Sequence, residues 1–320
     1  MNTFNNDKAF VFIVGSPRSG TTILGNILDC HQKVSQWFEP YFVWDHYFRH
    51  YPHDERNEKE MTPRIKHQIY SAFLKFKKKT GSKIIVDKSP RNSLKIPFIL
   101  EIFPHARFIH ILRDGRDATL SIHKEWDRIK RIVHTPNQKF AYVKDLPGII
   151  NWLRKQPFFL DKMKSLWFET HYNFIDNSKH LNKLRWNGNI GWGPRFKHWE
   201  EFFNKCSLLQ FNAYQWLNCV ENVNKNWSKI PNGNKIEIKY EDLLKKEGKI
   251  KEIIGFLGVK TDDHFLHSIP ELKRDNYNKW QKELLREQAN SLVHILTPML
   301  IKLGYETNYE WPLRISSCQR

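Results

Sequence analysis

One short segment near the N-terminus limits what this chain can fold into. Residues 10–22 read FVFIVGSPRSGTT. The run Phe10–Val14 has strand length and is apolar throughout, which is typical of a strand buried on both faces. A glycine-containing turn follows, and apolar residues then recur at helical spacing between positions 23 and 28. A strand, a glycine turn and a helix in this order direct successive backbone N–H groups and a helix N-terminus toward one point, so the segment predicts an anion-binding loop.

The loop departs from the usual nucleotide-binding pattern at one position. Residues 15–22 have the spacing G-x-x-x-x-G-K-[ST] of a P-loop, but Thr21 occupies the position of the lysine. In ATP chemistry that lysine neutralises the β and γ phosphates. A cation lies inside the loop instead, as Arg18, and its planar guanidinium suits an oxyanion with several oxygens. The alternative, a glycine-rich turn that binds nothing, is disfavoured by the flanking strand and helix.

The rest of the chain alternates β-rich and helical patterns. Further β-rich runs occupy residues 83–86, 107–112 and 235–240, and helical patterns occupy residues 62–79, 206–227 and 283–303. Such alternation favours a mostly parallel sheet with helices on both faces. We therefore expect an α/β, P-loop NTPase-like single domain over residues 1–320. Residues 127–194 are predicted to form an aromatic-rich helical insertion on the acceptor side, with Trp152, Trp167, Trp186 and Trp192.

Three parts of the sequence resemble one family. VFIVGSPRSGTT resembles the 5′-phosphosulfate-binding loop of the sulfotransferase family, and RFIHILRDGRDATLS resembles its 3′-phosphate-binding segment. The tail from NKWQKELL through LGYETNY is similar to the C-terminal part of tyrosylprotein-type sulfotransferases. The resemblance implies transfer of a sulfuryl group from 3′-phosphoadenosine-5′-phosphosulfate (PAPS) to a hydroxyl or amine acceptor. The product nucleotide is then adenosine 3′,5′-bisphosphate (PAP).

A second anion site is expected after the run Arg107–Leu112. Arg113 follows that run directly, so it should emerge at the carboxyl edge of the sheet, where ligands bind in open α/β folds. Ser121 comes about two helical turns later and could face the same pocket. The resemblance assigns both to the 3′-phosphate; a salt bridge from Arg113 to Asp114 or Asp117 is the alternative. The nucleotide-binding residues implied by the resemblance are Arg18, Ser19, Gly20, Thr21, Thr22, Arg113, Ser121, Tyr240, Arg274, Asn276 and Lys279.

The predicted catalytic residues are Glu39, Arg18 and Lys88. Glu39 stands in QWFEPYF, and its aromatic neighbours should desolvate the carboxylate and raise its basicity. The resemblance places the general base at this position, whereas a surface glutamate in a loop is the alternative. Lys88 follows IIVD and is implied to stabilise charge on the leaving phosphate oxygen. The competing bases are His31, His46 and His50.

Two other classes of function remain open. IIVD also fits a Walker B strand with Asp87 holding Mg²⁺, which would suit an ATP-dependent kinase, but the lost lysine at position 21 argues against it. A sulfuryl group carries less charge than a phosphoryl group, so we expect no metal requirement. The net charge of +18 would suit a basic nucleic-acid-binding protein. No nucleic-acid-binding motif is recognisable, and solubilising lysines explain the charge equally well.

The remaining expectations concern location and acceptor. The chain shows no basic and apolar leader and no run of about 20 apolar residues, so we expect a cytoplasmic protein without a membrane span. The acceptor stays open among carbohydrate, lipid, small phenol and protein tyrosine. The stretch GWGPRFKHWEEF, residues 191–202, is interpreted either as acceptor-binding or as a packed loop and helix start.

Overall fold

The computed structural model describes residues 7–48, 51–134, 186, 191–245, 247–273 and 276–315. Over these ranges a five-stranded parallel sheet has the order β2-β3-β1-β4-β5. The strands are β1 (Phe10–Val14), β2 (Val34–Phe38), β3 (Ile84–Lys88), β4 (Arg107–Leu112) and β5 (Lys235–Lys239). Because all strands run in one direction, their carboxyl ends meet at one edge of the sheet, which is where such folds bind ligands.

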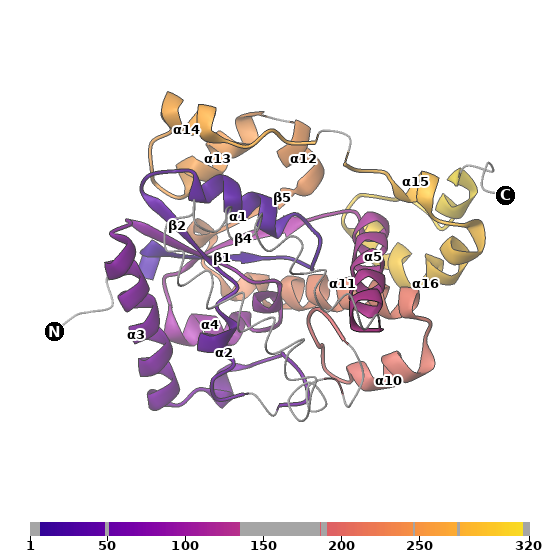
Figure 1. Ribbon diagram of the computed structural model, residues 1–320, viewed down its shortest axis with the longest axis horizontal. Helices are drawn as coiled ribbons and strands as arrows, with labels where there is room; N and C mark the ends of the chain where they lie inside the picture. The colour runs from indigo at the N-terminus through magenta and orange to yellow at the C-terminus, as the bar shows by residue number, and fades with distance from the viewer. Residues whose placement is uncertain are drawn as a thin grey trace.

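Helices cover both faces of the sheet (Figure 1). On one face lie α1 (Thr21–Asp29), α12 (Tyr240–Lys245), α13 (Glu247–Phe256) and α14 (Asp263–Ser268). On the other lie α2 (Tyr41–Trp44), α3 (Pro63–Thr80) and α4 (Ile96–Ile102), together with one side of α11 (Leu208–Asn226). Side chains of β1 alternate between these two layers, Phe10 and Phe12 toward α3 and Val11 and Ile13 toward α1.

A third apolar cluster stands beside the sheet. It joins α5 (Gly115–His134), α11 and α16 (Arg286–Lys302) with the short helices α10 (Trp199–Lys205) and α15 (Trp280–Glu283). Its centre is aromatic: the ring of Trp186 lies 5.4 Å from that of Trp126 and 4.7 Å from that of Trp199. None of the helices in the described ranges is both long and apolar enough to cross a bilayer.

The predicted fold class is confirmed, and most element boundaries agree with the sequence patterns. β1 and β4 have the predicted bounds, while β3 extends to Lys88 and β5 ends before Tyr240. The helix expected at residues 206–227 is α11, which begins after Ser207 because that side chain and Gln210 cap each other's backbone N–H groups. The helix expected at residues 283–303 is α16, which begins at Arg286 and ends at Lys302, while Glu283 ends the separate short helix α15.

Strand β2 was not predicted. Its sequence, VSQWF, is neither continuously apolar nor alternating, yet its first four residues are buried. The Ser35 hydroxyl bonds that of Ser82 at 2.6 Å, and the Gln36 backbone N donates to the Asp29 carboxylate at 2.7 Å. Contacts with other segments therefore hold this outermost strand in place.

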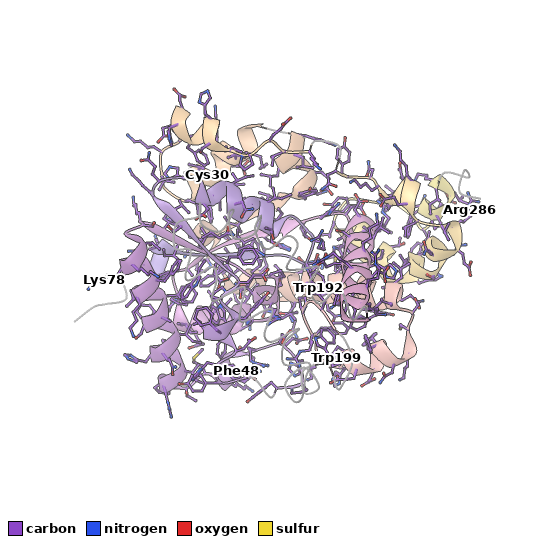
Figure 2. All side chains as sticks on the ribbon, in the orientation of Figure 1. Cys30, Phe48, Lys78, Trp192, Trp199 and Arg286 are labelled. Atoms are coloured by element: carbon purple, nitrogen blue, oxygen red, sulfur yellow. The ribbon has the colours of Figure 1, made fainter. Side chains whose placement is uncertain are left out.

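The predicted insertion can be judged only in part. Residues 127–134 continue α5, Trp186 is buried in the aromatic cluster, and residues 191–194 lead toward α10. Trp152 and Trp167 lie outside the described residues. Figure 2 shows Trp192 toward the middle of the view and Lys78 on α3 at the periphery.

Candidate active site

A cavity of about 490 Å³ opens at the carboxyl edge of the sheet. Segments that directly follow β1, β2 and β4 line it, together with the last residue of β3 and the first residue after β5. It brings together predicted site residues that are far apart in the sequence: Arg18, Gly20, Thr21, Thr22, Glu39, Lys88, Arg113, Ser121, Tyr240, Asn276 and Lys279. Arg274 lies outside the described residues, and Ser19 does not line the cavity.

The loop after β1 is held in a conformation that requires glycine. Gly20 has φ +93°, and a Cβ there would lie 2.4 Å from a ring carbon of Tyr240. The ring can pack against the loop because Gly20 has no side chain. Ser93 braces the start of the loop, accepting from Gly15 N at 2.8 Å and donating to Gly15 O at 2.9 Å. Ser19 is buried, and its hydroxyl bonds that of Ser16 at 2.5 Å, so its side chain supports the loop.

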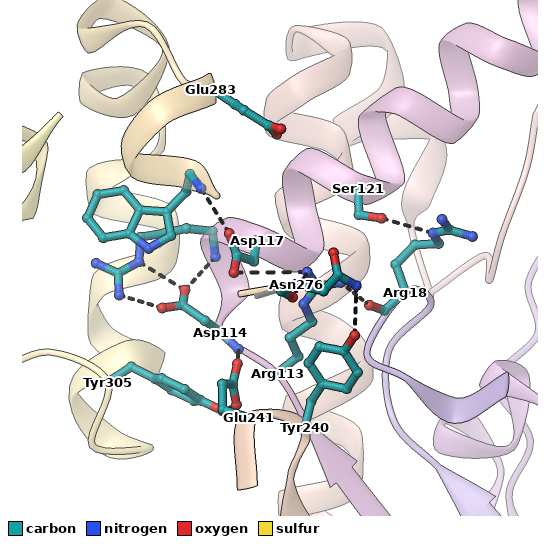
Figure 3. A network of polar contacts seen from close by, with 12 residues as sticks. Arg18, Arg113, Asp114, Asp117, Ser121, Tyr240, Glu241, Asn276, Glu283 and Tyr305 are labelled. Atoms are coloured by element: carbon teal, nitrogen blue, oxygen red, sulfur yellow. Dashed lines mark hydrogen bonds and ion pairs between the residues drawn. The ribbon is translucent and has the colours of Figure 1, made fainter. Parts of the chain in front are cut away.

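Arg113 lies at the centre of a polar network that Figure 3 shows. Its guanidinium donates to the Arg18 carbonyl at 2.8 Å and to the Asn276 carbonyl at 3.2 Å, and lies 4.8 Å from the Tyr240 ring centre. Asn276 donates to the Tyr240 hydroxyl at 2.7 Å, and Arg18 Nε donates to Ser121 Oγ at 3.0 Å. The loop, the first residue of α12 and residue 276 thus converge on Arg113.

The expected alternative for Arg113, an ordinary salt bridge, is only weakly represented. Its nearest approach to Asp117 is 3.9 Å, and Asp114 pairs with Arg116 instead. Asp117 accepts from the backbone N of Trp280 at 2.9 Å, which fixes the start of α15. Burial and the neighbouring Asp114 charge raise the pKa of Asp117 to about 6.

Arg116 ties the C-terminal segment to this site. It donates to Asp114 and to Glu306, and its guanidinium lies 3.9 Å from the ring centre of Trp280 and 5.3 Å from that of Trp311. A buried guanidinium that pairs with two carboxylates and lies against aromatic rings has its charge compensated. The role of Arg116 is therefore to hold the tail beside the cavity.

Glu39 and Lys88 meet across two neighbouring strands. In the β2–β3 register Phe38 lies opposite Lys88, and the Glu39 backbone N donates to the Lys88 carbonyl at 3.1 Å. The Lys88 ammonium donates to Glu39 Oε1 and lies 4.0 Å from the Phe38 ring centre. The side chains are 2% and 12% exposed for Lys88 and Glu39. Glu39 is thus a largely buried carboxylate on the cavity wall, unlike the surface glutamate of the alternative interpretation.

The described histidines proposed as competing bases lie elsewhere. His31 is buried against Phe265, with Nε2 3.0 Å from the Lys260 carbonyl. His46 packs edge-on against Tyr47, and neither histidine lines the cavity. His50 lies outside the described residues. Unlike His31 and His46, Glu39 lines the cavity, where it is paired with Lys88.

Asp87 is placed in the core and not in the cavity. Trp44 Nε1 and Ser89 Oγ each donate to one of its oxygens at 2.7 Å, and burial raises its pKa to about 6. Both oxygens are therefore engaged by neutral donors. The residues that the structure describes contain no cluster of three or more histidine, cysteine or carboxylate side chains suited to a metal. The Walker B interpretation of Asp87 is not favoured by this geometry.

Several cavity residues were not singled out from the sequence. They are Pro17, Ile23, Pro90, Leu120, Lys124 and Glu283. Helical spacing could have indicated Lys124, because it lies one turn beyond Ser121 on α5. Glu283 carried no local signal, because it reaches the cavity only through the docking of α15 on α5.

The stretch at residues 191–202 is mainly packed structure. Arg195 is buried and pairs with Asp54 through its backbone N at 2.8 Å and its guanidinium at 2.9 Å. Trp199 is buried and donates to the Pro52 carbonyl at 2.8 Å. Trp192 is the residue of this stretch that lines the cavity. The packed-loop interpretation holds for most of the stretch, and acceptor binding stays a prediction for Trp192.

Comparison with known proteins shows what this chain is similar to. Residues 10–138 match the model described as "Sulfotransferase family". The similarity to that family therefore covers this part of the chain. Two curated relatives are "Protein-tyrosine sulfotransferase 1" of Danio rerio, 29% identical over 131 residues, and "Protein-tyrosine sulfotransferase A" of Caenorhabditis elegans, 28% identical over 145 residues. Each match covers 37% of this chain and 36% or 34% of the relative, so the chain spans about a third of the length of the relatives it matches.

A solved structure extends the likeness in fold to the remaining chain. The "Sulfotransferase Domain from the Curacin Biosynthetic Pathway" has a TM-score of 0.52 and covers 93% of this chain and 98% of its own, at 14% sequence identity. At that identity the match concerns the fold alone. The matched residues 10–138 contain the loop, Glu39, Lys88, Arg113 and Ser121. Tyr240, Asn276 and Lys279 also line the cavity but lie outside the matched residues.

Proposed function

We propose that this chain transfers a sulfuryl group from PAPS to a hydroxyl-bearing acceptor. One observation carries the proposal: a single cavity brings together the predicted anion-binding loop, Arg113 and Ser121 of the predicted second anion site, and the Glu39–Lys88 pair. The first two features suit the two phosphate-bearing ends of the donor, and the third suits proton removal and charge stabilisation. The match of residues 10–138 to the sulfotransferase family model supports the same reaction.

The charges on the described cavity wall suit a polyanionic donor. Five cationic and three anionic side chains line it, so the balance is 5 − 3 = +2. The cations are Arg18, Lys88, Arg113, Lys124 and Lys279, and the anions are Glu39, Asp117 and Glu283. A concave site lined mainly by one sign of charge raises the local concentration of oppositely charged ligands. A volume of about 490 Å³ lies in the range of small-ligand pockets.

The proposed roles follow from the positions of the side chains. Thr21, Thr22 and the loop N–H groups hold the 5′-phosphate, while Arg113 and Ser121, with Tyr240, Asn276 and Lys279 beside them, hold the 3′-phosphate end. PAPS supplies the sulfuryl group, and PAP leaves. Glu39 accepts the proton of the acceptor hydroxyl, and Lys88 passes from Glu39 to the leaving oxygen. Arg18 stabilises the charge on the transferring group from the loop side.

The first expected result concerns nucleotide selectivity. PAP should bind at least about tenfold more tightly than AMP, because one charge-assisted contact to the 3′-phosphate is worth roughly 1.5–3 kcal/mol. Arg113→Ala should reduce the difference between the PAP and AMP affinities, because the Arg113 guanidinium is the cation that contacts the Arg18 and Asn276 carbonyls. Calorimetric titration of both nucleotides with both proteins measures the effect. Equal wild-type affinity for PAP and AMP would contradict the proposed function.

The second expected result concerns metal ions. Turnover should be unchanged by a chelator, because the proposed charge stabilisation comes from Arg18 and Lys88 and because both oxygens of Asp87 accept hydrogen bonds from neutral donors. Activity assays with PAPS, with and without chelator and added Mg²⁺, provide the measurement. A strict Mg²⁺ requirement would favour the kinase alternative and return Asp87 to the list of candidate ligands.

A further inference from the structure

Each described carboxylate on the cavity wall faces a cation of the same wall. Glu39 is paired with Lys88, Asp117 approaches Arg113 at 3.9 Å, and Glu283 accepts from Lys124 at 2.6 Å. The first pair belongs to the proposed chemistry and the second to the phosphate site. The third pair, between α5 and α15, has no role in either, although a carboxylate in a site for a polyanion opposes binding.

Lys124 continues the phosphate-binding face of α5. Asp117, Ser121 and Lys124 are spaced i, i+4 and i+7, so they share one face of the helix, and all three line the cavity. The cavity wall therefore carries a strip that starts at Arg113, at the end of β4, and ends at Lys124. An ammonium on a long flexible stem one turn from Ser121 can reach a phosphate group bound there.

The Lys124–Glu283 ion pair is weak enough for a bound phosphate to replace Glu283 as the partner of Lys124. The two side chains are 58% and 35% exposed, and surface ion pairs of this kind contribute little because water screens them. A phosphate carries more charge than a carboxylate and offers three oxygens, so it competes well for the same ammonium. Figure 3 shows Glu283 extending from α15 toward α5, above the Arg113 network.

We propose that Lys124 is a further ligand of the nucleotide 3′-phosphate, and that Glu283 occupies its ammonium until the nucleotide binds. This inference rests on the proposed function. Once Lys124 turns to the phosphate, Glu283 is left as an unpaired carboxylate beside an anion. That repulsion lowers nucleotide affinity and favours release of PAP after transfer.

The order of the sheet assigns Lys124 to the 3′-phosphate and not to the transferring group. Glu39 and Lys88 follow β2 and lie at the end of β3, on one side of β1. Arg113 and the strip on α5 follow β4, on the other side of β1. The loop after β1 separates the two ends, so a cation on α5 contacts the nucleotide end.

Calorimetric titration of the full chain with PAP and with AMP tests the inference. Lys124→Met should weaken PAP binding about five- to tenfold and leave AMP binding within about twofold, because AMP lacks the 3′-phosphate. Glu283→Gln should strengthen PAP binding about two- to fivefold. Lys130→Met is the matched control: Lys130 lies on the same helix but does not line the cavity, so neither affinity should change.

The outcomes separate this inference from the proposed function. If the wild-type protein does not bind PAP more tightly than AMP, both the inference and the proposed function are wrong. If it does, but Lys124→Met leaves PAP affinity unchanged or weakens PAP and AMP alike, the proposed function stands and the inference is wrong. Weaker PAP binding in Glu283→Gln also overturns it, because that result would make the pair a structural contact.

Discussion

Replacing Glu39 with glutamine is expected to lower turnover at least about a hundredfold, because loss of a general base costs typically 10²–10⁴-fold in rate. Glutamine keeps the size of the side chain and a carbonyl oxygen that can accept from Lys88, but it cannot take the acceptor proton. PAP affinity should change little, since Glu39 follows β2, away from the strip that starts at Arg113. Steady-state turnover with a working acceptor and calorimetry with PAP measure the two quantities.

A matched control distinguishes catalysis from fold support at Glu39. Glu60 is also partly buried, with a 20% exposed side chain 3.9 Å from Arg56, but it does not line the cavity. Glu60→Gln should leave turnover and PAP affinity near the wild-type values. Near-normal turnover in Glu39→Gln would overturn the assignment and leave His50 as the remaining histidine candidate. A lowered melting temperature with both functions weakened would instead make Glu39 a structural residue.

The sequence predicted which residues meet at the carboxyl edge of the sheet better than it predicted the details of the fold. Parallel strands bring the residues after each strand to one edge, so motifs such as GSPRSGTT and RDGRD must meet once the strands are recognised. β1 and β4 were recognised because both are buried and apolar along almost their entire length. The sequence pattern alone was therefore enough to assign residues 15–22 and Arg113 to the same edge of the sheet.

Features that depend on contacts between distant segments were not predictable in this way. β2 was missed because it is held by hydrogen bonds between the Ser35 and Ser82 hydroxyls and from the Gln36 backbone N to Asp29, which no local pattern reveals. The pairing of Glu39 with Lys88 is created by the β2–β3 register. Glu283 reaches the cavity because Asp117 fixes the start of α15. In each case the information lies in which elements pack together, and a single sequence does not contain it locally.

Replacing Lys88 with methionine is expected to lower turnover about 10²–10³-fold, the usual cost of removing one group that stabilises developing charge on oxygen. Methionine fills a similar apolar volume against the Phe38 ring but carries no charge. PAP affinity should fall less than turnover, because the proposed contact of Lys88 strengthens as the leaving oxygen gains charge. Turnover and PAP affinity, measured on the same preparation, test this difference.

Lys95 supplies the matched control for Lys88. It is also a buried lysine beside an aromatic ring, 5.2 Å from the centre of Trp44, and burial lowers its pKa to about 8, yet it does not line the cavity. Lys95→Met should keep turnover within a few fold of the wild-type value. A loss as large as that in Lys88→Met would mean that any buried lysine in this region is needed for folding, and melting temperatures of both variants would show it.

The double variant Glu39→Gln/Lys88→Met and the single variant Lys88→Arg test the pair together. Whether the two side chains act in one chemical step or Lys88 only holds Glu39 in place, removing both should cost about as much as the larger single loss, because residues that act as a unit are strongly non-additive. Lys88→Arg separates the two roles: if Lys88 only holds Glu39 in place, arginine should keep most of the turnover that Lys88→Met loses. If Lys88→Arg has near wild-type turnover, the role of Lys88 is to position Glu39. If Lys88→Arg loses turnover while its PAP affinity is unchanged, the result supports direct stabilisation of the leaving oxygen, because arginine cannot present the same compact charge.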